Sequence, residues 1–241
     1  MRDFVRLRVL CLGVIIVSST VHAKEFVYSA SDNLIGKICG AIIAEAHQRI
    51  GLKVSITNSP SKRTLIYANE GKYDGTPCRI ESIQKHYSNL VRVGSSHISV
   101  NSYVYTKELE FEVEGWNSLE PYTIGIHRGH KYVENNTQGM KIIPLGNDLQ
   151  LVKMLNLGRI DVAVMLEMDA LEAMKDANIR VKSLQPMLDS IPLYFHFHKK
   201  NLEYLPLMKQ SIQEMVESGR NNEIWTDIIT EELGEEFVRS D

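Results

Sequence analysis

The apolar and polar positions of the chain alternate between a strand period and a helical period. Residues 25–30 are a predicted strand, and residues 53–57 alternate in the manner of a second strand. Between them, apolar residues recur at helical spacing, at Ile38, Ala41, Ile42 and Ala46. Gly51 follows this predicted helix, and glycine is favoured just beyond the C-terminal end of a helix. The chain therefore opens with a strand–helix–strand unit.

The same rhythm continues to the C-terminus. Further strands are predicted at residues 73–78, 99–106, 123–127, 141–144, 161–166, 180–184 and 192–198. Helices are predicted at residues 62–69, after Gly129, near Leu149 and from residues 168–176. Two helices close the chain, with Gly219 as a stop. Strands that alternate with helices predict an α/β fold whose parallel sheets are covered by helices on both faces.

Two successive α/β units predict two lobes. We expect lobe I to comprise residues 24–106 together with residues 192–241, and lobe II to comprise residues 107–191. The strand predicted at residues 192–198 would return the chain to lobe I. Two crossings between lobes allow hinge closure around a ligand.

Residues 1–23 have the pattern of a cleaved export signal. Three arginines precede an apolar run over residues 9–17, and small or permissive residues stand before Lys24. The run is shorter than the about 20 apolar residues that span a bilayer, and an uncleaved anchor is the alternative. Cys11 lies inside the run, so we assign it to the signal core rather than to a lipid attachment. The sequence thus predicts a periplasmic protein.

The charge balance limits the class of partner. The 241-residue chain has a net charge of −3, and removal of three Arg and one Asp with residues 1–23 takes it to −5. A negative balance favours solubility and argues against a nucleic-acid partner. No other segment is long and apolar enough to cross a membrane. The remaining 218 residues suffice for one large domain or two small ones.

Two cysteines, Cys39 and Cys78, follow the predicted signal. An oxidising compartment favours a disulfide between them, and such a bridge would contribute about 3–4 kcal/mol in the chain-entropy model. Two separate buried thiols are an equal alternative, because free cysteine packs as a small hydrophobe. No Cys-x-x-Cys or histidine-rich spacing accompanies them, so the sequence predicts neither a metal site nor a cofactor there.

Several short segments occur in an order typical of one family of binding proteins. They are GKYD at residues 71–74, YVYTK at residues 103–107, Ile124-Gly125-Ile126 with Gly129, and LNLGRIDVA at residues 155–163. With them, the mature chain resembles the periplasmic solute-binding proteins of the polar amino acid type, family 3. Within that family it resembles a short, divergent subgroup, at Lys62-Arg63, Asp74-Gly75 and Arg79 among others. The resemblance implies a two-lobed, type II periplasmic-binding-protein fold with the ligand cleft between the lobes.

The chain departs from the best-known amino-acid binders at two places. Those proteins carry a Thr-x-Glu-Arg segment whose arginine holds the ligand carboxylate, whereas residues 80–87 here contain no arginine. They also carry an aspartate after a lobe II strand for the ligand ammonium, and here Leu166 stands at about that place with Glu167 next. Specificity for amino acids is therefore left open.

Two arginines of lobe I are candidates for a ligand carboxylate. Arg79 follows a predicted strand, at the sheet edge where open α/β sheets bind ligands, and Arg63 lies early in a short helix. Either guanidinium can form a bidentate pair with a carboxylate. The alternatives are an ordinary strand-end ion pair for Arg79 and a solvated helix charge for Arg63.

In lobe II, the turn around Gly129 is a candidate anion site. Backbone N–H groups at a helix N-terminus bind anions, and Arg128 and His130 would strengthen such a site. A polar loop without a ligand is an equal alternative. A metal is not predicted here, because no third ligand accompanies the two histidines of the segment.

Four further residues complete the candidate set. Glu167 follows a buried strand, where it would either receive a ligand ammonium or cap the next helix. Tyr28, Ser29 and Asp32 follow the first strand, where a ligand would also meet the chain.

Three functions fit this pattern. The first is a monomeric binding protein that delivers a small polar solute, amino-acid-like or a small carboxylate, to an ABC permease. The second is a periplasmic enzyme on the same fold, such as a dehydratase, with Glu167 and His127 or His130 as acid and base. The third is a sensor that presents its ligand to a membrane receptor. No nucleophile elbow, metal motif or phosphate loop supports catalysis, so we expect a binding protein without a cofactor.

Overall fold

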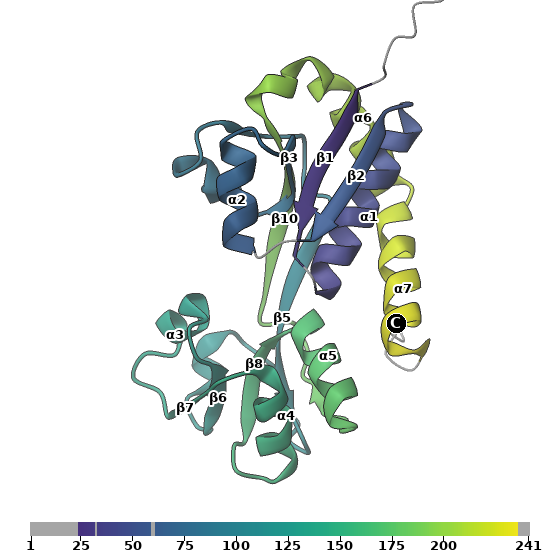
Figure 1. Ribbon diagram of the computed structural model, residues 1–241. Coiled ribbons are helices and arrows are strands. Elements are labelled where there is room, and N and C mark those ends of the chain that lie inside the picture. Colours follow the sequence, from purple (N-terminus) through teal and green to yellow (C-terminus); the bar gives the residue numbers. More distant parts are fainter. Residues whose placement is uncertain (1–23, 32, 59–60, 236–241) are drawn as a thin grey trace, which may run out of the picture.

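A computed structural model describes residues 24–31, 33–58 and 61–235. The elements form two lobes, one above the other, joined by two long strands (Figure 1). The predicted export signal and Asp32 lie outside the described residues. Among the described residues, no helix has the length and apolar character needed to span a bilayer.

Lobe I is built around a parallel strand pair and a helical layer. Strand β1 (Glu25–Ala30) pairs with β2 (Lys53–Asn58), and α1 (Leu34–Arg49) connects them. Helix α2 (Ser61–Asn69) then leads to β3 (Gly75–Arg79). The C-terminal helices α6 (Leu205–Glu217) and α7 (Arg220–Leu233) pack on α1. Three phenylalanines without solvent exposure hold these layers together: Phe26, Phe195 and Phe197.

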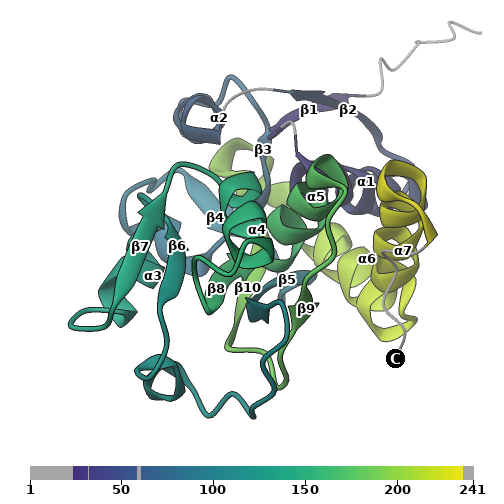
Figure 2. The same cartoon turned by 90° about the horizontal axis from the view of Figure 1, so that it is seen from below.

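Lobe II repeats the α/β arrangement. Strand β6 (Ile124–His127) runs parallel to both β7 (Ile142–Leu145) and β8 (Val162–Leu166). Helices α4 (Asp148–Asn156) and α5 (Glu167–Ala177) cover one face of this sheet, as seen from below in Figure 2. The remaining short elements are α3 (Lys131–Asn136), β9 (Lys182–Ser183) and the 3-10 turns η1 (Glu81–Lys85), η2 (Trp116–Leu119) and η3 (Lys199–Tyr204).

Two antiparallel strands connect the lobes. Residues 98–102 of β5 (Ile98–Thr106) pair with β10 (Asp189–His198), and residues 102–106 of β5 pair with β8. Beyond Leu193, β10 pairs with β3 and with β4 (Leu90–Arg92) of lobe I. The lobe boundaries expected at residues 106 and 191 thus fall at the end of β5 and inside β10. We propose that the hinge lies in the middle of these two strands.

The expectation of purely parallel sheets is wrong for the connecting strands. The pairs β1–β2, β6–β7 and β6–β8 are parallel, but β5 and β10 pair antiparallel with each other and with their neighbours β8 and β3. The reason is that one strand leaves lobe I and the other returns to it, so they run in opposite directions. The resulting strand order is β3-β10-β5-β8-β6-β7.

A buried carboxylate joins the parts of lobe I that are distant in sequence. Asp74, which is 6% exposed, accepts hydrogen bonds from the Val27 backbone N–H at 2.8 Å and from Asn201 Nδ2 at 3.1 Å. Lys200 Nζ lies 3.1 Å from the same carboxylate. Burial opposes ionisation of Asp74, but these donors outweigh it and lower the pKa of the carboxyl. The loop before β3 is thereby tied to β1 and to the returning chain.

Replacement of Asp74 by Ala is expected to lower the free energy of unfolding by about 1–3 kcal/mol, because buried donors lose their acceptor. The stabilisation is present above the unfolded-state pKa of about 3.9 and is lost as pH falls through the lower native pKa. Urea unfolding at neutral pH measures the loss. Glu70→Ala is the control, because Glu70 forms only an exposed ion pair with Lys72. Equal midpoints for the two variants would contradict the role of Asp74.

Candidate ligand-binding site between the lobes

A pocket of about 350 Å³ lies where the two lobes meet. This volume falls within the range of about 300–1,000 Å³ that is typical of small-molecule sites. Lobe I contributes the ends of β1 and β3 and the start of α1, while lobe II contributes the junction of β8 and α5. The polar side chains of its lining are Ser31, Asn33, Arg79 and Asp169.

Arg79 is the cation of this lining and stands at the last position of β3. Its Nη1 donates a hydrogen bond to the backbone oxygen of Cys78 at 2.6 Å, which holds the side chain against the pocket wall. Burial lowers the pKa of Arg79 to about 10, and the nearby Tyr87 opposes that shift. The guanidinium is therefore still charged at neutral pH. The structure places this sequence candidate in the pocket.

Asp169 supplies a carboxylate from the opposite lobe. It lies in the first turn of α5 and is partly buried. Burial raises the pKa of Asp169 to about 6, with further contributions from Asp148 and Glu172, while His127 acts in the opposite direction. At neutral pH the group is mainly ionised, and it becomes neutral in mild acid.

Sequence reasoning missed Asp169. The signal was present, because an acid in the first turn of a helix that follows a buried strand lies at the ligand-binding edge of a sheet. We considered Leu166 and Glu167 at that position instead. Leu166 does line the pocket, but Glu167 is only 7% exposed and accepts a hydrogen bond from Asn101 Nδ2 of β5 at 3.4 Å. The helix turns the acid at position 169, not the one at position 167, into the pocket.

The entrance to α1 forms the rim beside Arg79. Ser31 Oγ donates to Asn33 Oδ1 at 2.8 Å, and the same oxygen accepts the Gly36 N–H at 3.1 Å as the N-cap of α1. A Cβ atom at Gly36 would stand 1.9 Å from the backbone oxygen of Ser31, so only glycine permits this close turn. The rim is therefore fixed by local hydrogen bonds.

Tyr28 and Ser29 do not reach the pocket lining. Both side chains are fully buried in lobe I. The Nδ1 of His47 bonds the backbone oxygen of Ile43 at 2.8 Å, so Nδ1 carries the proton and Nε2 accepts the Tyr28 hydroxyl at 2.9 Å. Ser29 Oγ lies 3.2 Å from Thr64 Oγ1. These two candidates therefore serve the core, because their polar atoms are satisfied inside it.

The remaining lobe I candidate, Arg63, is exposed on α2 and is not part of the pocket lining. In lobe II, the backbone N–H groups around Gly129 are already bonded within the chain. Arg128 N–H donates to Leu145, Gly129 N–H to the Glu134 carboxylate at 2.8 Å and His130 N–H to His127. The following helix α3 is also short. These three N–H groups of the turn therefore already have acceptors within the chain.

His127 and His130 belong to a polar group behind Asp169. The Nδ1 of His127 lies 2.7 Å from Asp148 Oδ2, and the two imidazole rings stack with centroids 4.2 Å apart. Burial lowers the pKa of His130, as does the neighbouring His127. Asp148 thus has a hydrogen-bond partner in this group and at the same time raises the pKa of Asp169.

Helix α5 makes direct contact with lobe I. The backbone N–H of Leu34, the first residue of α1, donates to Glu172 Oε1 at 3.1 Å. Lys175 Nζ donates to the backbone oxygen of Glu232 in α7. Glu172 and Lys175 follow Asp169 by about one and two turns of α5, so the pocket closes on the side where α5 meets α1 and α7.

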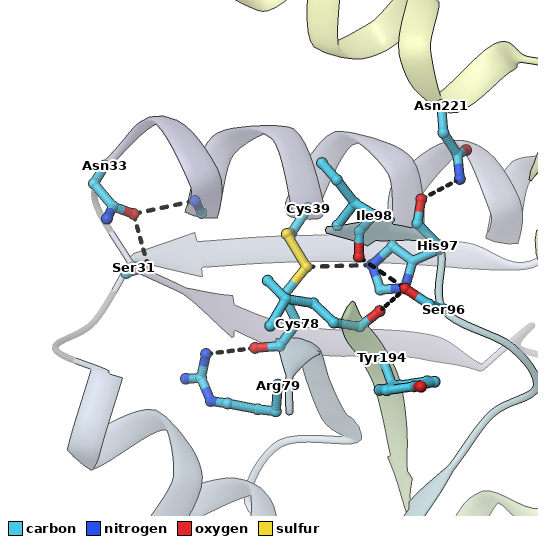
Figure 3. Close-up of a disulfide and its surroundings, with 12 residues drawn as sticks. Ser31, Asn33, Cys39, Cys78, Arg79, Ser96, His97, Ile98, Tyr194 and Asn221 are labelled. Atoms are coloured by element: carbon cyan, nitrogen blue, oxygen red, sulfur yellow. Dashed lines mark hydrogen bonds between the residues drawn. A yellow bond between two sulfur atoms is a disulfide. The ribbon is translucent and has the colours of Figure 1, made fainter. Parts of the chain in front are cut away.

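Of the two alternatives for the cysteines, the structure has the disulfide. Cys39 of α1 and Cys78 of β3 are bonded, with their Cα atoms 5.9 Å apart (Figure 3). Both residues line the pocket. The bridge joins the helix that starts at the pocket rim to the strand that ends at Arg79.

Comparisons with known proteins agree with this arrangement. No family model matches the chain. An uncharacterized protein of Shewanella oneidensis is 21% identical over 186 residues, which is 74% of this chain and 70% of that protein. A similar solved structure is the second substrate binding domain of a putative amino acid ABC transporter from Streptococcus pneumoniae, with TM-score 0.65 and 18% identity over 83% of this chain and 97% of that chain.

Two further structures are similar over most of their length. An ancestral arginine-binding protein bound to arginine has TM-score 0.59 and 18% identity, with 86% of this chain and 99% of that chain covered. A histidine kinase sensor domain with similarity to periplasmic binding proteins has TM-score 0.61 and 12% identity, with 86% and 96% covered. The chain has the two-lobed fold of the periplasmic binding proteins. The fold class expected from the sequence is thereby confirmed.

Reduction of the Cys39–Cys78 bridge is expected to lower the free energy of unfolding by about 3–4 kcal/mol, the chain-entropy value for a loop of this length. Urea unfolding with and without a phosphine reductant measures the difference. The double variant Cys39→Ser/Cys78→Ser serves as the control and should not respond to the reductant. A wild-type midpoint that stays unchanged while free thiols appear would refute the expectation.

Proposed function

We propose that this chain is a solute-binding protein that captures a small zwitterion, such as an amino acid, between its lobes. The observation that carries the proposal is the pairing of charges in one pocket, with Arg79 from lobe I and Asp169 from lobe II. Arg79 would hold the ligand carboxylate through two parallel hydrogen bonds, and Asp169 would accept the ammonium. Each charge of such a ligand then has a partner when the pocket excludes water.

The rest of the lining suits the remainder of an amino acid. Ile35, Ile80 and Met168 offer apolar surface from both lobes. A neutral solute of the same size would bring neither a carboxylate to Arg79 nor an ammonium to Asp169, so it would gain less from these two charged side chains. The pocket therefore favours zwitterions over sugars or simple apolar compounds.

The place of this binding in the cell follows from the fold and the predicted signal. We propose export to the periplasm and delivery of the solute to an ABC permease, which the fold relatives named as transporter components support. A sensory role is the second candidate, because a histidine kinase sensor domain shares the fold. We propose no catalysis, and recovery of the bound solute unchanged after prolonged incubation tests that point against the enzyme alternative.

A thermal-shift screen of the mature protein against amino acids and small carboxylates would identify the ligand, because a ligand that binds only the native state raises the unfolding temperature. Calorimetry then tests the site. Arg79→Ala and Asp169→Asn are each expected to weaken binding at least about tenfold, because loss of a buried charged partner typically costs 2–5 kcal/mol.

Arg63→Ala is the matched control, since Arg63 is an exposed arginine of the same lobe. It should bind within about twofold of the parent, well inside the about 1.4 kcal/mol that corresponds to a tenfold change. Folded Arg79→Ala and Asp169→Asn proteins that bind as tightly as the parent would refute the proposed site. A larger loss of ligand affinity in Arg63→Ala than in Arg79→Ala would make Arg63, and not Arg79, the main partner of the ligand carboxylate.

The affinity for a zwitterion should depend on pH through Asp169, whose pKa is about 6 in the free protein. Above that value the carboxylate is ready to accept the ammonium, whereas below it binding must first release a proton. The affinity should therefore fall by up to about tenfold for each pH unit below 6. Calorimetry between pH 4.5 and 8 checks this slope, and Asp169→Asn should show no such dependence. An affinity that rises in acid would contradict the role of Asp169.

A further inference from the structure

Two sulfur atoms in the wall of the pocket lie beside a histidine nitrogen. Cys39 Sγ, Cys78 Sγ and a ring nitrogen of His97 all lie within 4.8 Å of one another, and all three residues are buried. They come from α1, from β3 and from the residue that precedes β5 (Figure 3). In the sequence, no Cys-x-x-Cys or histidine-rich spacing marks the two cysteines as metal ligands. The fold brings His97 to them.

The ring of His97 is oriented toward the sulfur atoms. Its Nε2 lies 3.2 Å from Cys78 Sγ, and its backbone oxygen accepts the Asn221 side chain at 2.6 Å. Nδ1 is buried and has no hydrogen-bond partner among the described residues. A buried histidine of purely structural role, such as His47, has both ring nitrogens bonded instead.

The spacing suits a four-coordinate metal once the sulfur atoms separate. Zn²⁺ binds thiolate at about 2.3 Å and imidazole at about 2.0–2.1 Å in tetrahedral geometry, which puts neighbouring donors about 3.5–3.8 Å apart. The present sulfur-to-nitrogen distance of 3.2 Å is close to that value. Cleavage of the disulfide removes the covalent constraint between Cys39 and Cys78, and the two sulfur atoms would then move apart to this spacing.

We propose that the reduced form of this chain binds one thiophilic divalent cation, of the Zn²⁺ type, through Cys39, Cys78 and His97. A dithiol reductant supplies two electrons and two protons to the disulfide and is itself oxidised to a disulfide. The metal then displaces the two thiol protons, forms two metal–sulfur bonds and takes the lone pair of the neutral imidazole. The disulfide form has no thiolate and holds no metal, so binding is under redox control.

The fourth coordination position would open toward the pocket, because both cysteines line it. Three protein ligands with one open position are typical of zinc sites that bind water or a substrate. Metal binding would therefore place a cation in the wall next to Arg79. The proposal is independent of the zwitterion proposed above, since it concerns the reduced protein and needs no solute.

Co²⁺ is the probe, because its thiolate complexes absorb in the near ultraviolet and its tetrahedral complexes absorb strongly in the visible. The protein is reduced with a trialkylphosphine, which is oxidised to the phosphine oxide and takes its oxygen atom from water. Excess reductant is then removed under anaerobic conditions. Titration should give both absorptions and saturate at one Co²⁺ per chain, and Zn²⁺ should displace the cobalt. The oxidised protein should give neither absorption.

Variants assign the ligands. The double variant Cys39→Ser/Cys78→Ser should lose the near-ultraviolet band. Loss of an outer-shell partner of a metal ligand typically lowers metal affinity about 10–100-fold. Reduced His97→Gln loses a direct ligand, so its affinity for Co²⁺ should fall by more than that. His196→Gln is the matched control, because His196 is an equally buried histidine outside the donor group. It should keep the 1:1 binding. Far-ultraviolet circular dichroism reports whether each protein is folded.

The outcomes separate clearly. Reduced, folded protein that shows no sulfur-to-cobalt absorption would overturn the proposal, as would full affinity in His97→Gln. Loss of binding in folded His196→Gln would also count against it. If reduction alone unfolds the chain, restoration of the native dichroism by Co²⁺ or Zn²⁺ supports the site, because binding then drives folding. Failure of both metals to restore it would refute the site.

Discussion

The hydrogen bonds to the buried Asp74 carboxylate are the constraint on which the binding site depends. They fix the loop before β3 against β1 on one side and against the chain returning from β10 on the other. Strand β3 carries Cys78 and Arg79 at its far end. The position of the proposed carboxylate partner, and of one half of the disulfide, is therefore set by a group about one strand length away that never meets a ligand.

The pocket combines rigid and adjustable parts. In lobe I, the N-cap at Asn33, the close turn at Gly36 and the Cys39–Cys78 bridge fix the wall around Arg79. In lobe II, Asp169 lies on a helix whose neighbours tune its protonation. The lobes are joined by two strands, and closure can bring the two halves of the site together without altering either of them.

Local patterns predicted much of this structure. The bounds of β1 agree with the predicted strand, and the site candidate Arg79 lies in the pocket because strand ends in open α/β sheets gather at one edge. Side-chain roles that depend on contacts with distant segments of the chain could not be predicted from the sequence. Tyr28 lies in β1 near the strand end where a ligand was expected, but its hydroxyl bonds His47 in the core. The antiparallel return of β10, the role of Asp169 and the approach of His97 to the cysteines all arise from contacts between segments far apart in the chain.

The contact between Glu172 and the Leu34 N–H has a consequence for the kinetics of the protein. It joins α5 of one lobe to the first turn of α1 of the other through protein groups alone. Such a contact stabilises the arrangement with the lobes together, and a larger population of a binding-competent arrangement lessens the loss of apparent affinity. Release then requires this bond to break, together with that of Lys175 to Glu232. In the proposed function, the residence time of a solute would therefore depend in part on the start of α1.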